Sequence, residues 1–276
     1  MGLYVTSNVA AMNAYRNLSL TQGTQNSSLE KLSSGYRINK AADDAAGLAI
    51  SQGLQAQIGG ISVAVQNTQD AISVVQTADG ALTETQSILQ RMRNLAVQSA
   101  NGGFQDTNAQ AASQTEFGQL QTELDRIATS TKFGSQALLD GTYNGTFQVG
   151  ANAGETISVD LTGNKSDSTT LAVDSGSITV NSTSTASSAI TAIDAAIKTV
   201  STTRATLGAF QNRFQHTVNN LNVAVENLTA SNARIQSTDM ASEMVKFTSA
   251  QILSQAGTAM LAQANQQPQS ILKLLQ

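Results

Sequence analysis

Apolar residues recur at every seventh position in the C-terminal third of the chain. The row consists of Leu207, Phe214, Leu221, Leu228 and Ile235. A strict seven-residue repeat forms a narrow apolar seam on one side of a helix, and such a seam is buried only against another helix. The pattern therefore predicts a long helix, from about Ala186 to Ile235, that packs lengthwise on a second helix.

A second long helix, from about Ala45 to Asn101, is predicted by rows of the same spacing. Its two rows are Ile61, Thr68, Val75, Leu82, Leu89 and Ala96, and Ile58, Val65 and Ile72. At ~1.5 Å per residue this helix is roughly 80 Å long. Because the two seams match in length and spacing, we expect the long helices to pair antiparallel. A shorter helix is predicted between them in sequence, from Asn108 to Thr129.

The stretch from Lys132 to Thr185 differs, because Gly, Asn, Thr and Ser interrupt short alternating runs. The runs are residues 146–149, 156–161 and 177–180. Alternation of apolar and polar residues between turn residues is typical of β-hairpins. The sequence therefore predicts a mainly α chain of long, antiparallel, coiled-coil-like helices with a small β-hairpin region.

The two ends of the chain are expected to be weakly structured when alone. A helix is predicted from Gly2 to Leu32, but its middle, residues 19–28, is nearly all polar, so we expect residues 1–35 to be disordered in the free monomer. The other end finishes on Pro268 and an apolar turn. That turn contains Ile271, Leu272, Leu274 and Leu275. Because exposed termini usually fray, we expect this end to be covered by the N-terminal segment or by a neighbouring copy.

Composition also favours association between copies. Aromatic residues make up 4% of the chain and charged residues 12%, against about 25% charged residues in an ordinary globular protein. Few large core residues and few repelling charges suit a chain that completes its core against copies of itself. The net charge of −4 and the lack of basic patches interleaved with aromatic residues argue against nucleic-acid binding.

Signals for secretion and membrane insertion are missing from the sequence. Residues 1–20 have no basic region followed by a continuous apolar core, so we expect no cleaved secretory signal. There is no run of 18 apolar residues, so we expect no membrane insertion. The absence of Cys excludes disulfides and Cys-ligated metals.

Candidate catalytic residues are few. Asp43 and Asp44 are adjacent on a loop, where two carboxylates do not face each other across a substrate, so we interpret them as an N-cap pair for the following helix. His216 has no Cys, His or Asp partner at metal-ligand spacing. No hydrolase, metalloprotease or Walker motif occurs, so we expect no enzymatic activity, no metal and no cofactor.

One charged stretch, residues 90–95, has two interpretations. Arg91 and Leu95 are i,i+4 neighbours on one helix face. The first interpretation is a solvated edge of the seam helix, which is what most charged helix faces are. The second is a contact surface for another molecule.

Several long runs of the sequence resemble bacterial flagellin. The N-terminal runs are residues 29–39 (LEKLSSGYRIN) and 42–50 (ADDAAGLAI). The C-terminal runs are residues 207–214 (LGAFQNRF), 250–253 (AQIL) and 262–266 (AQANQ), and residues 148–156 (QVGANAGET) resemble the hairpin of the family's core domain. These motifs are long, ordered and correctly spaced, and the resemblance covers the chain except about residues 160–185.

The resemblance implies a subunit of the bacterial flagellar filament, used for swimming motility. It implies a terminal domain, called D0, of residues 1–42 plus 236–276, whose paired helices form the inner tube of a helical filament. A helical core domain, called D1, would contain residues 43–235, with a β-hairpin and variable region at about 141–185. The large outer domains of many relatives are expected to be missing, and residues 160–185 are expected to be an exposed variable part.

The resemblance also implies partners besides the chain itself. These are a flagellar export chaperone on the C-terminal helix, residues 237–276, the filament cap, and the hook–filament junction proteins. Relatives leave the cell unfolded through a type III export channel, so an extracellular location is implied. In relatives, the residues that match Arg91, Leu95 and Glu116 form the surface recognised by Toll-like receptor 5. Asn94 departs from the Glu that relatives often carry there.

Two alternatives share the same helical architecture. One is a hook–filament junction protein, which assembles in a single short ring. The other is a surface adhesin that binds through the Ser/Thr-rich β region.

Overall fold

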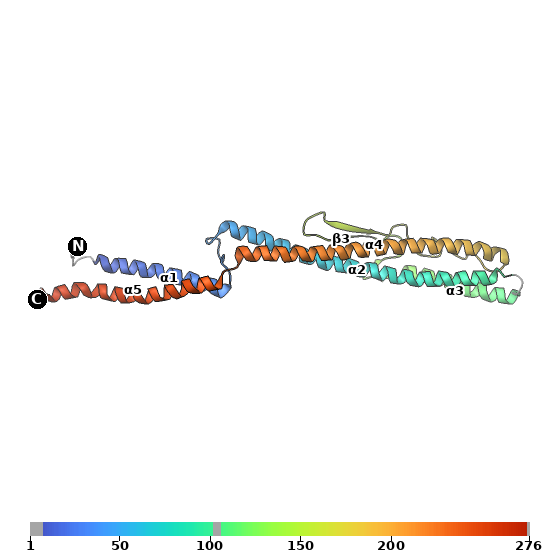
Figure 1. The fold of residues 1–276 in the computed structure, drawn as a ribbon. Helices are drawn as coiled ribbons and strands as arrows, with labels where there is room; N and C mark the ends of the chain where they lie inside the picture. The colour runs from blue at the N-terminus through green and yellow to red at the C-terminus, as the bar shows by residue number, and fades with distance from the viewer. Residues whose placement is uncertain (1–7, 102–105, 275–276) are drawn as a thin grey trace. The chain divides into compact units, whose positions relative to one another are not determined.

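The structure is a computed structural model, and it describes residues 8–101 and 106–274. It contains α1 (Val9–Ser34), α2 (Ala45–Ser99), α3 (Thr107–Ser130), α4 (Thr183–Gln236) and α5 (Met240–Leu274) (Figure 1). The short strands are β1 (Lys132–Phe133), β2 (Gln136–Ala137), β3 (Asn144–Gln148) and β4 (Thr156–Asp160). The mainly α prediction is confirmed. The start of the first predicted helix, residues 2–7, and the apolar residue Leu275 lie outside the described residues.

The chain divides into two compact units. Residues 1–56 with 227–276 form one, here called the terminal unit, and residues 57–226 form the other, the central unit. The sequence placed the division in the loops, at residues 42 and 236. In the structure the compact units divide inside α2 and α4.

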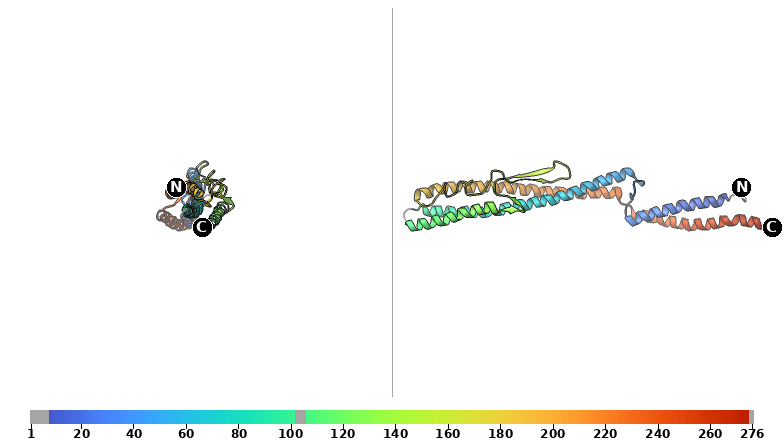
Figure 2. Two further views of the ribbon diagram at one scale, coloured as in Figure 1. Left: turned by 90° about the vertical axis from the view of Figure 1, so that its right-hand side faces the viewer. Right: turned by 180° about the vertical axis from the view of Figure 1, so that it is seen from behind.

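The core of the central unit is built from α2, α3, α4 and the segment between α3 and α4. The predicted row on α2 is buried, with Leu82 and Leu89 at 0% exposure. Two ion pairs fix the direction of α4 against α2: Arg93 Nε lies 2.7 Å from Asp194 Oδ1, and Arg204 Nε lies 2.8 Å from Asp79 Oδ1. A higher residue number on α2 meets a lower one on α4, so the two helices run antiparallel, as the matching seams predict. Figure 2 shows them alongside each other.

The predicted hairpin is present. β3 and β4 pair antiparallel, and their register places Phe147 opposite Ile157. The Phe147 ring meets the ring of Phe214 edge-on, with centroids 5.9 Å apart, so the hairpin packs directly on the seam of α4. The third predicted strand, residues 177–180, is wrong: this stretch is turn and irregular structure. The two-residue pair of β1 and β2 was not predicted from the sequence.

The resemblance implies that residues 160–185 are an exposed variable part, but many of these residues are buried. Their apolar residues belong to the core of the central unit: Leu161, Leu171, Val173, Ile178 and Val180. Three polar side chains of α3 hold this segment along the helix. Their hydrogen bonds are Asp125 with the Ser168 N–H, Gln121 with the Val173 carbonyl and Gln114 with the Val180 N–H.

In the terminal unit, α1 pairs antiparallel with α5. Asn8 Nδ2 donates to the Ala264 carbonyl over 2.7 Å at one end, and Ser28 Oγ lies 2.7 Å from Glu243 Oε1 toward the other. Asn8 also caps α1 by accepting from the Ala11 N–H. Gly35 ends α1 in the left-handed region, at φ 74°, where a glycine lacks the steric penalty of a side chain. The two terminal helices therefore pair with each other, as the sequence predicts.

Candidate interaction surface

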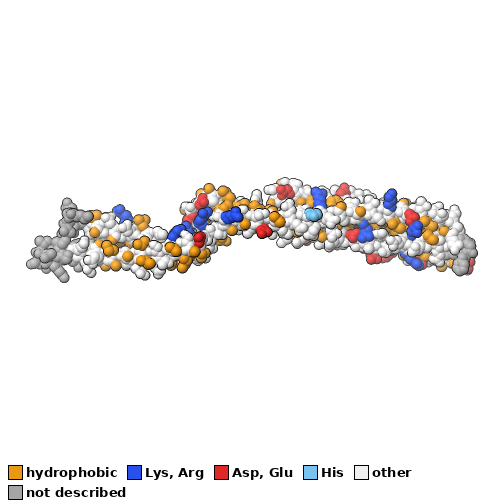
Figure 3. Space-filling model, viewed as in Figure 1, with side chains coloured by type: hydrophobic (Ala, Val, Ile, Leu, Met, Phe, Trp, Pro, Cys, Tyr) orange, Lys and Arg blue, Asp and Glu red, His pale blue; other side chains and the backbone are white. Residues whose placement is uncertain are grey.

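Exposed apolar side chains are concentrated in the terminal unit. Of the seventeen large hydrophobic residues that are exposed in the described part of the chain, thirteen lie there. They are Val9, Met12, Tyr15, Leu20, Leu29, Tyr36, Ile50, Met240, Met244, Val245, Ile252, Leu253 and Met260. In Figure 3 hydrophobic side chains show along the surface of the two terminal helices. A face this apolar indicates a surface that binds another protein surface.

The same unit has almost no core of its own. Its buried hydrophobic residues in the described ranges are Leu18, Ile38 and Ala250. Leu18 lies over Gly257, where an added Cβ would meet Leu18 Cδ1 at 3.3 Å. The central unit is the opposite, since Leu82, Phe117 and Phe214 are among many side chains at 0% exposure there. One unit is therefore packed within the chain, while the other lacks partners for most of its apolar side chains.

Two open, mostly apolar hollows lie on the terminal unit. One is on α5 and is lined by Met244, Val245, Thr248, Ser249, Ile252 and Leu253. The other lies between α1 and α5, and is lined mainly by Met12, Tyr15, Leu20 and Leu261. The first has no titratable side chain in its lining, and the second has Tyr15 and Arg16 beside mostly apolar residues, so their chemistry fits apolar side chains from another helix better than a polar substrate.

A buried polar contact lies near the end of the α1–α5 pair where α1 ends and α5 begins. Ser28 is 2% exposed and Glu243 is 5% exposed. Glu243 also accepts from Lys246 Nζ at 3.0 Å. The hydrogen bond from Ser28, with that from Lys246, holds the pKa of the Glu243 carboxyl below its usual range. A single buried polar contact in a helix pair fixes how the helices are aligned, because any slip leaves the carboxylate buried without its donor.

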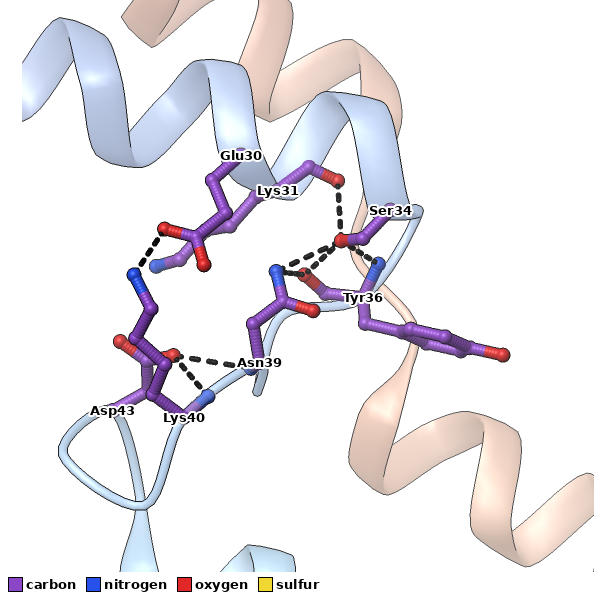
Figure 4. Close-up of polar contacts among 7 residues, drawn as sticks. All are labelled: Glu30, Lys31, Ser34, Tyr36, Asn39, Lys40 and Asp43. Carbon is purple, nitrogen blue, oxygen red and sulfur yellow. Dashed lines mark hydrogen bonds and ion pairs between the residues drawn. The ribbon is translucent and has the colours of Figure 1, made fainter.

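The loop after α1 is stabilised by polar contacts that Figure 4 shows. Ser34 Oγ accepts from the Tyr36 N–H and from Asn39 Nδ2, at 3.1 and 2.8 Å. Lys40 Nζ forms an ion pair with Glu30 Oε2 at 2.7 Å. Together these contacts fold the loop back on the last turn of α1.

Asp43 and Asp44 both accept hydrogen bonds from backbone N–H groups, but only Asp44 caps a helix, so the predicted N-cap pair is wrong for Asp43. Asp44 Oδ1 accepts from the Gly47 N–H at 2.9 Å, so Asp44 is the N-cap of α2, as predicted. Asp43 instead accepts from two N–H groups of the preceding loop. The backbone N–H groups of Lys40 and Asn39 hold the pKa of Asp43 below its usual range.

The chain segments that follow α1 and α4 are joined by backbone hydrogen bonds. The Arg37 N–H donates to the Gln236 carbonyl at 2.7 Å, and the Thr238 N–H donates to the Gly35 carbonyl at 3.0 Å. The Arg37 guanidinium also donates to the Ile235 carbonyl at 2.8 Å. This junction was not predicted from the sequence, because main-chain pairing between segments about 200 residues apart leaves no pattern in side chains.

The predicted seam of α4 is buried along only part of its length. Leu207 and Phe214 are at 0% exposure. Leu221, Leu228 and Ile235 are half-buried. Leu221 belongs to the central unit and Leu228 and Ile235 to the terminal unit, so burial of the seam already decreases before the terminal unit begins.

The three residues expected to form a receptor surface have different environments. Arg91 and Glu116 are exposed and form an ion pair, with Arg91 Nη2 2.6 Å from Glu116 Oε1. Leu95 is 3% exposed and belongs to the core of the central unit. Leu95 was expected to be at the surface and is not, because it lies on the buried face of α2 with Met92 and Ala96.

Two further features bear on metal binding and membrane insertion: the grouping of metal-ligating side chains and the hydropathy of α2. No group of three or more His, Asp, Glu or Cys side chains that suits a metal ion occurs in residues 8–101 and 106–274, and His216 is exposed. α2 contains an 18-residue window with a mean hydropathy of 1.2, and 11% of that window is buried. By length and composition alone, α2 is therefore long and apolar enough to span a membrane. A helix with apolar rows that face other helices passes the same test.

These features define a mainly helical protein with exposed apolar side chains on its terminal unit, and comparison with known proteins agrees with them. Residues 5–144 match the family model for the bacterial flagellin N-terminal helical region, and residues 190–275 match that for its C-terminal helical region. The chain belongs to the bacterial flagellin family. It is a structural protein, and its role is that of a filament subunit.

Individual relatives match over their full length. A flagellin of Halalkalibacterium halodurans is 51% identical over 277 residues, covering 99% of this chain and 100% of the relative. The flagellin of Bacillus subtilis is 46% identical over 301 residues, covering 98% of this chain and 99% of the relative. The crystal structure of Bacillus cereus flagellin is 34% identical, with a TM-score of 0.50, and covers 56% of this chain and 88% of that one. These full-length matches do not favour the junction protein or the adhesin.

The chain is a short member of the family. Its alignment with flagellin C of Vibrio cholerae extends over 377 positions, at 35% identity, although this chain has 276 residues. The chain therefore lacks a large outer domain.

Proposed function

We propose that this chain builds the flagellar filament by a coupled process, in which the terminal unit becomes stable only when it packs among copies of itself. The observation that supports this is the contrast in burial between the two units. The thirteen exposed large hydrophobic side chains of the terminal unit have no cover within the chain, whereas the central unit has a continuous core.

The energetic argument starts from α1. Of its 26 residues, Leu18 and Ser28 are buried. Ordering a residue costs about 1–2 kcal/mol of backbone entropy, and an isolated helix of low amphipathicity does not recover this cost in water. Burying one large apolar side chain contributes about 1.5–3 kcal/mol. Burial of the exposed apolar side chains of α1 and α5 against neighbouring copies therefore supplies the free energy that orders these helices.

The geometry of assembly follows from the type of surface. The apolar residues of the terminal unit lie on several sides of the α1–α5 pair, and two hollows accept apolar side chains from neighbouring helices. A contact between different faces of identical copies is head-to-tail, and it propagates as a helix when it does not close. In this proposal the terminal unit forms the inner tube, D0, and the central unit forms the surrounding D1 layer.

The test uses seeded polymerisation of purified monomer, followed by electron microscopy and sedimentation. A double variant, Ile252→Ser with Leu253→Ser, removes two exposed apolar side chains from the hollow on α5. The control, Gln251→Ser with Gln255→Ser, changes two exposed polar positions on the same helix. We expect the first variant to lose filaments and the control to keep them. Deletion of residues 237–276 is expected to abolish filaments, and normal filaments from the truncated chain would refute the mechanism.

The export chaperone, the filament cap and the junction proteins are further proposed partners. The exposed apolar row of α5, which contains Met244, Val245 and Ile252, supports chaperone binding, because an amphipathic helix binds in the apolar groove of a partner. By covering this row before export, a chaperone would prevent premature assembly inside the cell, and the assembled protein would be extracellular. Calorimetric titration with the family's export chaperone tests this step. Equal affinity for the full chain and for the chain without residues 237–276 would exclude α5 as the binding site.

Recognition by Toll-like receptor 5 is proposed through Arg91 and Glu116 alone. Their exposed ion pair presents two charged groups beside each other on α2 and α3, while the burial of Leu95 removes it from direct contact. A receptor reporter assay with monomeric Arg91→Ala tests the proposal. Arg126→Ala is the matched control, because Arg126 is also exposed and paired with a glutamate, Glu123. An equal response from the two variants would exclude the Arg91 surface.

A further inference from the structure

The methionines of this chain are divided sharply between its two units. Met12, Met240, Met244 and Met260 are exposed by 61%, 46%, 51% and 64%, and all four lie in the terminal unit. Met92, in the central unit, is at 0% exposure. A solvent-exposed thioether reacts readily with oxidants, while a buried one is protected by its packing. The structure thus places four exposed methionines in the terminal unit and a buried one in the central unit.

We propose that these four methionines are a reversible oxidation site that controls assembly of the free monomer. The reagent class is two-electron oxidants such as hydrogen peroxide. The thioether sulfur attacks one peroxide oxygen, so that an S–O bond forms as the O–O bond breaks. The sulfur is oxidised by two electrons to the sulfoxide, and the peroxide is reduced to water.

The effect on assembly follows from where these side chains lie. Met244 lines the apolar hollow on α5 beside Ile252 and Leu253. Met12 lines the hollow between α1 and α5 beside Tyr15 and Leu20. A sulfoxide adds a polar oxygen to these mostly apolar surfaces, and burying an unpaired polar group is unfavourable. The oxidised monomer keeps its packed central unit but presents a polar surface to the next copy.

Reversibility distinguishes this site from ordinary damage. The two methionine sulfoxide reductases, one for each sulfoxide epimer, restore the thioether with two electrons and two protons from a dithiol, which becomes a disulfide while the sulfoxide oxygen leaves as water. Because their substrates in the free monomer are exposed side chains on helices near the chain ends, the enzymes have access to them. In the filament the same side chains are covered, so oxidation and repair act on the monomer before it is added.

This inference rests on the proposed coupled assembly, so the experiment distinguishes a failure of the oxidation proposal from a failure of the proposed function. Monomer is treated with hydrogen peroxide, the sulfoxides are mapped by peptide mass spectrometry, and seeded polymerisation is measured by sedimentation. The control variant replaces Met12, Met240, Met244 and Met260 by Leu, a swap of similar volume that cores tolerate, and it keeps the other two methionines of the chain, Met1 and Met92. A further control is treated wild-type protein repaired with both reductases.

We expect sulfoxide at the four terminal-unit positions and not at Met92. The monomer concentration needed for growth is expected to rise at least about tenfold. Repair restores growth, and peroxide treatment leaves the growth of the Leu variant equal to that of the same variant untreated. Normal growth of treated wild type with all four sulfoxides overturns the inference, as does equal inhibition of the treated Leu variant. Failure of untreated wild type to grow on seeds would instead refute the proposed function. If the Leu variant itself fails to grow, the comparison of treated wild type before and after repair by the reductases still tests the inference.

Discussion

Replacing Ser28 by Ala removes one buried hydroxyl from the contact between α1 and the first turn of α5, and the structure sets the size of the effect. Ser28 Oγ donates to Glu243 Oε1 over 2.7 Å, and both side chains are buried, at 2% and 5% exposure. Without the hydroxyl, the carboxylate stays buried with Lys246 as its remaining side-chain donor. A hydrogen bond to a charged group contributes about 1.5–3 kcal/mol.

Seeded growth is the assay for this change. If the α1–α5 pair must form for a subunit to add, a loss of about 1.5–3 kcal/mol raises the monomer concentration needed for growth by roughly ten- to a hundredfold. Ser27→Ala is a close control, because Ser27 is the adjacent residue of the same helix and is exposed. Both variants gain the same helix propensity, so the difference between them isolates the buried contact. Equal growth of the two variants would show that the Ser28–Glu243 contact does not align the terminal helices.

Three further predictions use the same structure. The pKa of Glu243 is lowered in the folded chain, so the carboxylate's contribution to stability is present above its ordinary pKa and is lost as pH falls through the folded pKa. Filament growth measured from neutral to acid pH should therefore weaken in that range. The same pH profile in Glu243→Gln would contradict this. Gly47→Ala should destabilise the start of α2 by about 1–3 kcal/mol in a thermal melt, because the new Cβ would lie 2.7 Å from Ile38 Cδ1. The control Gly53→Ala should not destabilise the protein, because nothing lies within 4 Å of its added Cβ. Gln121→Ala leaves the Val173 carbonyl without its donor, so amides 166–180 should exchange faster by hydrogen–deuterium exchange than in Thr122→Ala, an exposed neighbour.

The sequence predicts best where a pattern repeats. The seven-residue rows on α2 and α4 identify two long antiparallel helices, since a long apolar row of this period fits a helix packed along another helix and little else. The alternation in residues 146–149 and 156–161 identifies the β3–β4 hairpin in the same way. In both cases the position of a residue within the repeat determines which face of the helix or strand it occupies.

Prediction fails where burial depends on contacts between distant segments. Residues 160–185 lie outside the stretches that carry the resemblance, which is why they were expected to be an exposed variable part. They are buried because side chains of α3 supply the hydrogen bonds that a helix or sheet would otherwise provide. Leu95 was misplaced for a related reason, because the resemblance that placed it on a surface carries no information about packing in this chain.

The central claim is that the terminal unit becomes stable through its neighbours, and residue-resolved hydrogen exchange on monomer and filament tests it most directly. In the monomer, amides of residues 9–34 and 240–267 should exchange fast while those of residues 71–96 and 186–214 are protected, and in the filament all four stretches should be protected. Strong protection of residues 9–34 in dilute monomer would contradict the account.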